Sequence, residues 1–268
     1  MGEGVNMDSK RPLLRVERFS KSFGGVQALL NVSFDVWEGD VFGIIGPNGS
    51  GKTTLVNCIT SFVKRDTGDL HFKGRALKRG IPPHKVADLG IARTFQITRP
   101  YYSLPAYKNL IIPLLSARAR RTGGWRGGGK HGDRDTVGLD ILEEIGFERD
   151  SFIPYKLASA LPTGYLKRLE LARCLAIRPD LVICDEIFSG LSGSEIATMT
   201  PLIEKLQMEG VTLIMIEHRL RELFRVANRV MVLNFGVKIS EGTSDQVMAD
   251  EKVKEAYFGS DQEVMDYA

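Results

Sequence analysis

The stretch VFGIIGPNGSGKTTLVNCITSF, residues 41–62, decides the fold. Its first five residues form a continuous apolar run, which predicts a short buried strand, and residues 53–62 predict a helix. Between them, GPNGSGKT at 46–53 matches the pattern G-x-x-x-x-G-K-[ST]. A strand, a glycine-rich loop and a helix in this order predict a loop that wraps phosphates.

The residue types of this loop each have a chemical reason. Glycines let backbone N–H groups approach phosphates without a Cβ in the way. Lys52 would place its charge on the β- and γ-phosphates, and Thr53 would offer its hydroxyl to Mg²⁺. The loop therefore predicts a nucleotide bound together with magnesium.

A second motif, LVICDE at 181–186, supplies two carboxylates. Four apolar residues predict a buried strand, and Asp185 and Glu186 follow at its carboxyl end, where α/β sheets place their ligands. We expect Asp185 to hold Mg²⁺ through water and Glu186 to act as the general base that polarises the attacking water.

Further apolar runs extend the sheet. Residues 212–216 and 230–234 predict buried strands, and 237–240 predicts a hairpin partner for the latter. Residues 32–36 alternate apolar and polar side chains, which predicts a half-buried antiparallel strand. Residues 243–246 match a capping box that opens a final helix. Continuous apolar strands alternating with helices indicate an α/β fold whose parallel sheet is covered on both faces.

The middle of the chain has a different pattern. Residues 98–180 lack clear strand signals and contain helical patterns at about 104–120, 136–147 and 165–177, which indicates a helical insert. Within it, residues 121–135 are rich in glycine and charge. They predict a flexible solvent loop, with a basic arm that touches lipid headgroups or a partner as the alternative.

Composition excludes several classes of function. The net charge of +3 is too weak to indicate nucleic-acid binding, and the three cysteines lack CxxC spacing and are expected to be buried. No apolar run approaches the roughly 20 residues of a membrane helix, and the polar start predicts no secretory signal. A role at a membrane would therefore be that of a peripheral subunit.

Five further motifs follow one another in a characteristic order. KSFGGVQAL at 21–29 precedes the loop, ARTFQ at 92–96 and ALPTGYLKRLELARC at 160–174 follow it, and SGLS at 189–192 and IEHRL at 216–220 come last. In this order the sequence resembles the ATP-binding cassette (ABC) ATPases over nearly its whole length. The closest resemblance is to the ATPase subunits of branched-chain amino-acid importers, through residues 57–62, 90–96, 168–174 and 255–259.

The resemblance implies a fold and a set of partners. The fold is a P-loop NTPase (RecA-like) core with an antiparallel β subdomain and a helical subdomain. It implies one ABC ATPase domain at 13–268, with its core at 13–97 and 181–268, the helical subdomain at about 98–180, and a flexible N-terminus at 1–12. The partners are transmembrane permease subunits, a second ABC ATPase subunit and a solute-binding protein, with no nucleic acid. The protein would lie peripherally on the cytoplasmic face of the cell membrane.

The resemblance also implies roles for single residues toward ATP and Mg²⁺. Phe23 would stack on adenine. Gln96 would arrange Mg²⁺ and its waters together with Thr53 and Asp185, and would sense the membrane subunits. His218 would hold the γ-phosphate and the geometry of Glu186. The residues implied to wrap the phosphates are Gly46, Pro47, Asn48, Gly49, Ser50, Gly51, Lys52, Thr53 and Thr54.

One motif departs from the family pattern. The family signature is close to L-S-G-G-Q and binds the ATP of the opposite subunit; this chain has LPTGY, made of Leu161, Pro162, Thr163, Gly164 and Tyr165. Pro162 has neither the serine hydroxyl nor an N–H. Losing one hydrogen bond to a charged group costs about 1.5–3 kcal/mol. Binding at this signature should therefore weaken without vanishing.

Three hypotheses follow. In the first, the chain pairs with a different ATPase subunit and the two ATP sites are unequal. In the second, it forms a homodimer with two weakened sites, and Thr163 takes the serine's role. In the third, it is a soluble ABC ATPase with no membrane partner, which acts on DNA or the ribosome. The resemblance favours import of branched-chain or other hydrophobic amino acids, with urea, amides or aromatic acids as alternative cargoes.

Overall fold

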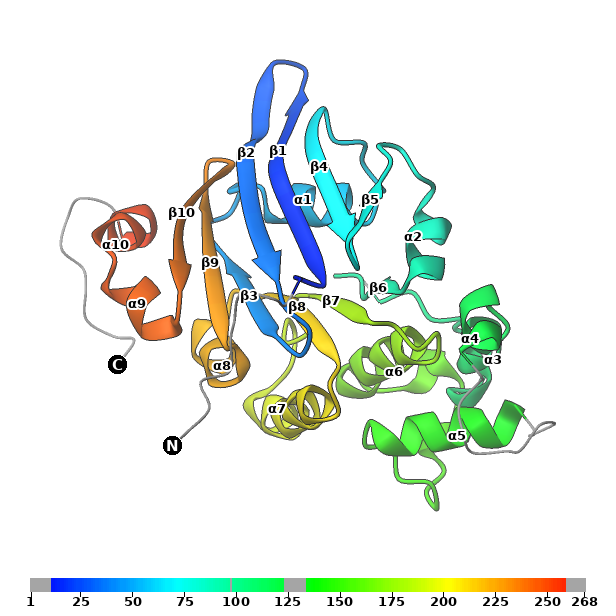
Figure 1. The fold of residues 1–268 in the computed structure, drawn as a ribbon. Helices are drawn as coiled ribbons and strands as arrows, with labels where there is room; N and C mark the ends of the chain where they lie inside the picture. Colours follow the sequence, from blue (N-terminus) through cyan, green and yellow to red (C-terminus); the bar gives the residue numbers. More distant parts are fainter. Residues whose placement is uncertain (1–10, 97, 123–133, 259–268) are drawn as a thin grey trace, which may run out of the picture.

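The computed structural model describes residues 11–96, 98–122 and 134–258, which form two sheets with helices around them (Figure 1). The predicted N-terminal tail and the glycine-rich stretch at 121–135 fall mostly outside the described residues. The first sheet is antiparallel, in the order β2-β1-β4-β5. Its strands are β1 (Leu14–Phe23), β2 (Val26–Val36), β4 (Thr67–Phe72) and β5 (Arg75–Leu77).

The second sheet carries the core, in the order β10-β9-β3-β8-β7-β6. Strands β9, β3, β8, β7 and β6 run parallel, and β10 pairs antiparallel with β9. The strands are β3 (Val41–Ile45), β6 (Ile91–Arg93), β7 (Leu181–Asp185), β8 (Thr212–Ile216), β9 (Arg229–Asn234) and β10 (Val237–Gly242). Every residue of β3, β7 and β8 is buried, as their continuous apolar sequences predict.

Helices cover the central sheet. The two sheets enclose α1 and one apolar cluster, and α6, α7 and α8 cover the opposite face with a second cluster. The α-helices are α1 (Lys52–Ile59), α2 (Pro83–Leu89), α3 (Ile111–Leu114), α4 (Ala117–Arg121), α5 (Arg134–Glu144), α6 (Thr163–Leu175), α7 (Gly193–Met208), α8 (Leu220–Val226), α9 (Ser244–Ala249) and α10 (Glu251–Phe258). Short 3₁₀ turns lie at Tyr107–Leu110, Ile153–Tyr155 and Ala158–Ala160.

The predicted fold class is confirmed: the protein has a parallel α/β core sheet and an antiparallel β subdomain. The expected capping box is present, because Thr243 and Gln246 bond each other's backbone N–H at the start of α9. The described residues between 98 and 180 form helices and 3₁₀ turns, with one isolated bridge between Pro105 and Leu157.

Two expectations were wrong in detail. The predicted helix at about 104–120 is a 3₁₀ turn followed by two short helices, because Pro113 lacks an N–H and Ser116 caps a new start at α4. The helix expected over 53–62 ends at Ile59, where the Thr60 hydroxyl donates to the carbonyl of Val56.

Several helices and strands were not predicted from the sequence. The motif at 21–29 lies in the β1–β2 hairpin, and the sequence did not predict β1. Strands β4, β5 and β6 and helices α2 and α8 have only three to seven residues, too few to show a periodicity. Among the described residues, no helix is long and apolar enough to cross a membrane.

Candidate functional site

The phosphate loop connects β3 to α1 and needs glycine at two positions. A Cβ on Gly46 would lie 2.0 Å from the carbonyl oxygen of Leu233, and one on Gly51 would lie 2.5 Å from that of Ala28. Gly51 also has a φ of +104°, a backbone conformation that is unfavourable for residues with a Cβ. The loop therefore packs closely between β9 and β2. Its inner side is formed by backbone atoms, as a loop that wraps phosphates requires.

Lys52 lies inside this loop. Its Nζ donates to the carbonyl oxygens of Gly46 at 2.7 Å and Pro47 at 3.0 Å. Burial lowers the pKa of Lys52, while Glu186 and Asp185 act in the opposite direction. The loop thus contains one buried ammonium group, suited to a phosphate that arrives among the same carbonyls.

Three residues predicted to be catalytic meet at the carboxyl end of the central sheet. Glu186 directly follows β7. Its Oε2 accepts a hydrogen bond from Gln96 Nε2 at 2.8 Å, and its Oε1 lies 3.2 Å from His218 Nε2. The three come from β6, β7 and β8 ends that are far apart in sequence, so the sheet order brings them together.

Asp185 is buried at the end of β7. Its Oδ2 accepts from Arg93 Nη2 at 2.7 Å, and its backbone N–H donates to Thr94 Oγ1 at 3.0 Å. Thr53 lies in the first turn of α1, beside Lys52. Magnesium takes one or two protein oxygens and completes its octahedron with phosphates and water, so this carboxylate and hydroxyl fit the ion.

Sequence reasoning missed Lys167, which ties α6 to the catalytic residues. It is buried, and its Nζ donates to the carbonyl oxygens of Glu186 at 3.0 Å and Gln96 at 3.3 Å. In the sequence, Lys167 stands between Leu166 and Arg168 in the helix expected over 165–177, and the motif there did not mark it as functional. Its charge fixes the two segments that carry Glu186 and Gln96.

Glu217, next to His218, was also missed. It is 2% exposed, and its Oε1 accepts from the N–H of Phe188 at 3.1 Å. Burial raises its pKa to about 8, against hydrogen bonds from the N–H groups of Phe188 and Ile187 that lower it. The group holds the loop after Glu186, and the motif around it gave no sign of this.

The LPTGY segment forms the start of α6. Pro162 is the N-cap residue, Thr163 begins the helix, and Leu161 is buried. The N–H of Gly164 donates to Glu195 Oε1 at 3.2 Å. The Tyr165 ring packs edge-on against Phe147 at 5.0 Å between centroids.

Glu195 belongs to the start of α7. Its carboxylate accepts from the N–H of Ser192 at 2.9 Å and from the Ser192 hydroxyl at 2.8 Å, in a capping box. These bonds to Ser192, and then the one from Gly164, lower the pKa of Glu195. A carboxylate of the same chain therefore lies at the helix start where the resemblance implies a phosphate.

Phe23 lies at the end of β1. The residue is 48% exposed, and Lys21 Nζ lies 5.0 Å from the centroid of its ring. An exposed ring at a hairpin end is free to stack on a planar group, and its contact with adenine stays a prediction.

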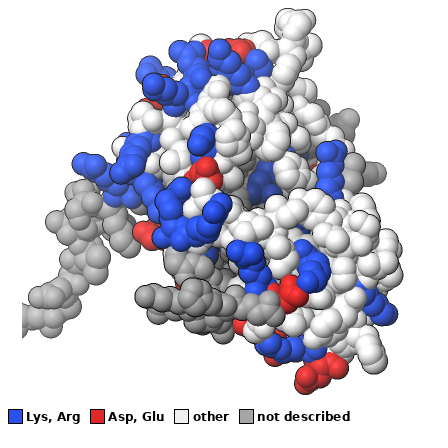
Figure 2. All heavy atoms as spheres, turned by 90° about the vertical axis from the view of Figure 1, so that its right-hand side faces the viewer, with Lys and Arg blue, Asp and Glu red and all other residues white. Residues whose placement is uncertain are grey.

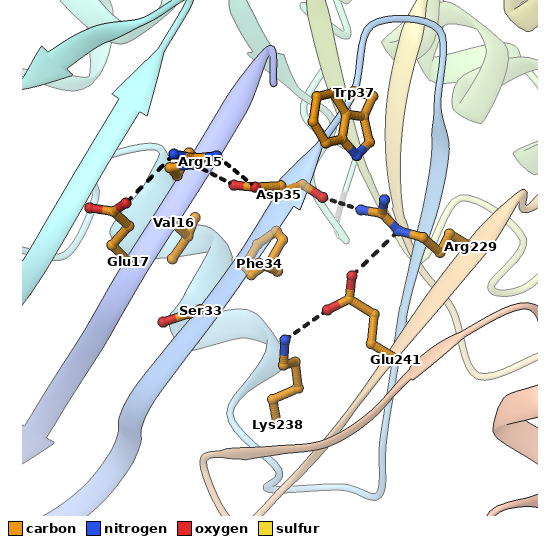
Figure 3. A pocket seen from close by; sticks show the side chains of 10 residues that line it. All are labelled: Arg15, Val16, Glu17, Ser33, Phe34, Asp35, Trp37, Arg229, Lys238 and Glu241. Carbon is orange, nitrogen blue, oxygen red and sulfur yellow. Dashed lines mark hydrogen bonds and ion pairs between the residues drawn. The ribbon is translucent and has the colours of Figure 1, made fainter. Parts of the chain in front are cut away.

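A charged pocket of about 470 Å³ lies between β1, β2 and the β9–β10 hairpin (Figure 3). Its charges face one another: Arg15 pairs with Asp35 at 2.9 Å, and Glu241 pairs with Lys238 at 2.8 Å and Arg229 at 3.4 Å. Each of these ion pairs stays within one sheet, and the Arg229 guanidinium also donates to the carbonyl oxygen of Asp35, which connects the two sheets across the pocket.

A second hollow, the groove, lies between the core and the helical segments. It has a volume of about 410 Å³. Its apolar lining includes Phe62, Val86, Phe95, Tyr101 and Ile112. The face of the molecule that carries β5, α2 and α4 shows many Lys and Arg side chains and few acids (Figure 2). Residues 62–121 contain 13 Lys and Arg residues and 3 Asp residues, in a chain of net charge +3.

Comparison with known proteins agrees with this geometry. A family profile described as "ABC transporter" matches residues 29–189, and one described as "Branched-chain amino acid ATP-binding cassette transporter" matches residues 237–263. The protein is 33% identical over 259 residues to the high-affinity branched-chain amino acid transport ATP-binding protein BraF of Pseudomonas aeruginosa, covering 93% of this chain and 98% of BraF. It is 31% identical over 254 residues to LivG of Escherichia coli, with the same coverage of both chains.

Solved structures give the same result. A nucleotide-free ATP-binding cassette from an ABC transporter superposes with a TM-score of 0.79 at 31% identity, covering 93% of this chain and all of the other. The ADP conformation of an ATP-binding cassette of an ABC transporter gives 0.78 at 31% identity, covering 93% and 99%. With its phosphate loop, paired acids and P-loop NTPase core, the chain belongs to the ABC transporter ATP-binding proteins, among relatives that serve branched-chain amino acid transport.

Proposed function

We propose that this ATP hydrolase energises the import of branched-chain or other hydrophobic amino acids, as a peripheral subunit on the cytoplasmic face of a cell membrane. The names of its relatives and the profile match at 237–263 support this cargo. Uptake by the assembled transporter tests it: labelled leucine should accumulate on addition of ATP. Accumulation of urea, an amide or an aromatic acid instead of leucine would contradict the cargo.

The hydrolytic role is supported above all by the contacts of Gln96 and His218 with the Glu186 carboxylate. Glu186 would take the proton of the attacking water, while His218 keeps the carboxylate aimed at the γ-phosphate. Lys52 and the loop N–H groups would bind the phosphates. Thr53, Gln96 and Asp185 would hold Mg²⁺, which supplies charge neutralisation on the phosphate oxygens when bound.

A single substitution tests this assignment. Glu186→Gln should lower the hydrolysis rate by about 10²–10⁴-fold, because the general base is lost while the shape is kept. Binding of a fluorescent ATP analogue should persist. Glu209→Gln, at the exposed end of α7, is the matched control and should hydrolyse ATP at the wild-type rate. Full activity of Glu186→Gln would contradict the role of Glu186.

We further propose that the groove receives a transmembrane permease subunit. Its apolar lining suits an apolar segment, and the basic residues around it suit carboxylates on the same partner. Ile112→Asp, in the groove, should abolish co-purification with the permease while the isolated chain still hydrolyses ATP. Met208→Asp, exposed on α7 outside the groove, should leave co-purification unchanged.

A second ABC ATPase subunit would complete the ATP sites, and a solute-binding protein would deliver the cargo. The contact between Gly164 and Glu195 supports unequal sites, because it adds a negative charge where the second ATP would bind. The mixed dimer tests this. Glu186→Gln in this chain should nearly abolish hydrolysis, whereas loss only through the partner's equivalent change would contradict it. Cooperative hydrolysis by the purified chain alone would favour the homodimer, with Thr163 in the serine's role.

A further inference from the structure

We propose that Arg93 is a positioning residue that shares the Asp185 carboxylate with Mg²⁺ and connects this carboxylate to the groove. The inference rests on the proposed function, since it takes Asp185 as a residue that holds magnesium. Arg93 is the last residue of β6 and Asp185 the last of β7, on neighbouring parallel strands.

One side of the Arg93 guanidinium faces the nucleotide site. Its Nη2 lies 2.7 Å from Asp185 Oδ2, and the two side chains are 7% and 5% exposed. Its Nη1 donates to Asn57 Oδ1 at 2.6 Å, on α1 directly behind the phosphate loop. A buried pair is little screened by water or salt, so the charge of Arg93 acts strongly on this carboxylate.

The other side of the guanidinium faces the groove. The Arg93 Cζ lies 6.0 Å from the ring centroid of Phe62 and 5.4 Å from that of Phe95. Both rings are partly exposed and line the groove, and Arg93 lines it with them. A segment that packs into the groove therefore presses on the rings that hold Arg93 in place.

Two cations then compete for one carboxylate. Arg93 and Mg²⁺ both draw on the negative charge of Asp185 and repel each other, so Arg93 weakens the binding of magnesium. When Arg93 moves away from Asp185, magnesium should bind more tightly. Occupation of the groove and binding of the Mg²⁺–nucleotide complex are thereby linked through a single side chain.

The experiment measures binding of a fluorescent ATP analogue to the full chain, with Mg²⁺ and with EDTA. The ratio of the two affinities is the magnesium enhancement. Arg93→Met keeps the length of the side chain and removes the charge, so the enhancement should rise about tenfold. Arg93→Lys keeps the charge but loses the planar fork that reaches both Asp185 and Asn57, so its enhancement should lie between those of the wild type and Arg93→Met. Arg120→Met, on the exposed side of α4, is the matched control and should change nothing.

Two variants probe the anchors of Arg93 without touching its charge. Phe62→Ala removes a groove ring, and Asn57→Ala removes one hydrogen bond. Both variants should raise the magnesium enhancement, but by a smaller factor than Arg93→Met does. They also keep the test decisive if Arg93→Met fails to fold, which circular dichroism would reveal: unchanged enhancement in both would overturn the inference.

Asp185→Asn separates this inference from the proposed function. Loss of the enhancement in Asp185→Asn, together with an unchanged or lower value in Arg93→Met, would overturn the role of Arg93 alone. A wild-type enhancement in Asp185→Asn would instead contradict the magnesium role of Asp185, on which both depend.

Discussion

At the scale of single residues, the start of α6 is held by a carboxylate of its own chain. Glu195 Oε1 accepts from the N–H of Gly164, and a Cβ on Gly164 would lie 2.6 Å from the same oxygen. Like charges repel at short range, so Glu195 opposes a phosphate that approaches this helix start. Besides Pro162, Glu195 is thus a second feature that weakens phosphate binding at the LPTGY segment.

Glu195→Gln should ease ATP-driven dimerisation. The amide oxygen can still cap α7, but the negative charge is gone. In a Glu186→Gln background, which slows hydrolysis, we expect the ATP concentration for half-maximal dimerisation to fall about three- to tenfold. Size-exclusion chromatography with light scattering measures this. An unchanged midpoint would show that phosphate does not approach Gly164.

Glu217 makes stability depend on pH. Its pKa is about 8 in the folded protein, against 4.5 for a glutamate side chain surrounded by water, as in the unfolded chain. Below pH 4.5 the carboxyl is neutral in both states. As the pH rises from 4.5 to 8, the unfolded chain releases the proton that the folded chain still holds, so the free energy of unfolding falls.

Glu217→Gln should remove this loss. The amide is neutral at every pH, and its oxygen can accept the same backbone hydrogen bonds. At pH 8 the variant should exceed the wild type by about 4 kcal/mol in the free energy of unfolding, and near pH 4.5 the two should agree. Urea unfolding at both values measures the difference, with Glu209→Gln as the control that follows the wild type. A variant less stable at pH 8 would contradict this interpretation.

At the scale of elements, the sequence predicted local structure correctly where all residues of a motif are consecutive in the chain. The capping box of α9 is complete within four residues, and the phosphate loop within eight. The helix expected at 104–120 failed because Pro113 and the Ser116 cap divide it, although the apolar spacing continues through them. Caps and breakers therefore decided the helices more firmly than periodicity did.

Thr243→Ala should weaken the start of α9. The Thr243 hydroxyl accepts from the N–H of Gln246, and this bond satisfies a donor at the helix start. We expect a loss of about 1 kcal/mol in the free energy of unfolding, measured by urea denaturation. Thr243→Ser keeps the acceptor and should stay close to the wild type; an equal loss in both would contradict the capping role.

At the scale of the whole molecule, the phosphate loop links the two sheets. A backbone carbonyl of β2 lies against Gly51, and one of β9 lies against Gly46. A nucleotide in the loop should therefore stabilise both sheets together, because it binds the folded chain only.

ATP with Mg²⁺ should raise the melting temperature of the full chain. At a concentration of about 100 times the dissociation constant the gain is about 2.7 kcal/mol, or roughly 5–10 °C for a chain of this size. Lys52→Ala should lose most of this shift, since the charge on the phosphates is gone. Scanning calorimetry measures both, and an equal shift in Lys52→Ala would contradict the role of Lys52.

The sequence by itself determined the phosphate loop, the buried strands around it and the acids after β7, because each is written in consecutive residues whose local geometry follows from their type. The tertiary structure decided the contacts between them. Gln96 and His218 meet Glu186, Arg93 holds Asp185, and Glu195 reaches Gly164 only because the sheet order and the packing of α6 on α7 bring distant strand and helix ends to one place. The spacing of residues along the chain determines on which face of a helix or strand a side chain lies. Only the folded protein determines which side chains of other elements it contacts.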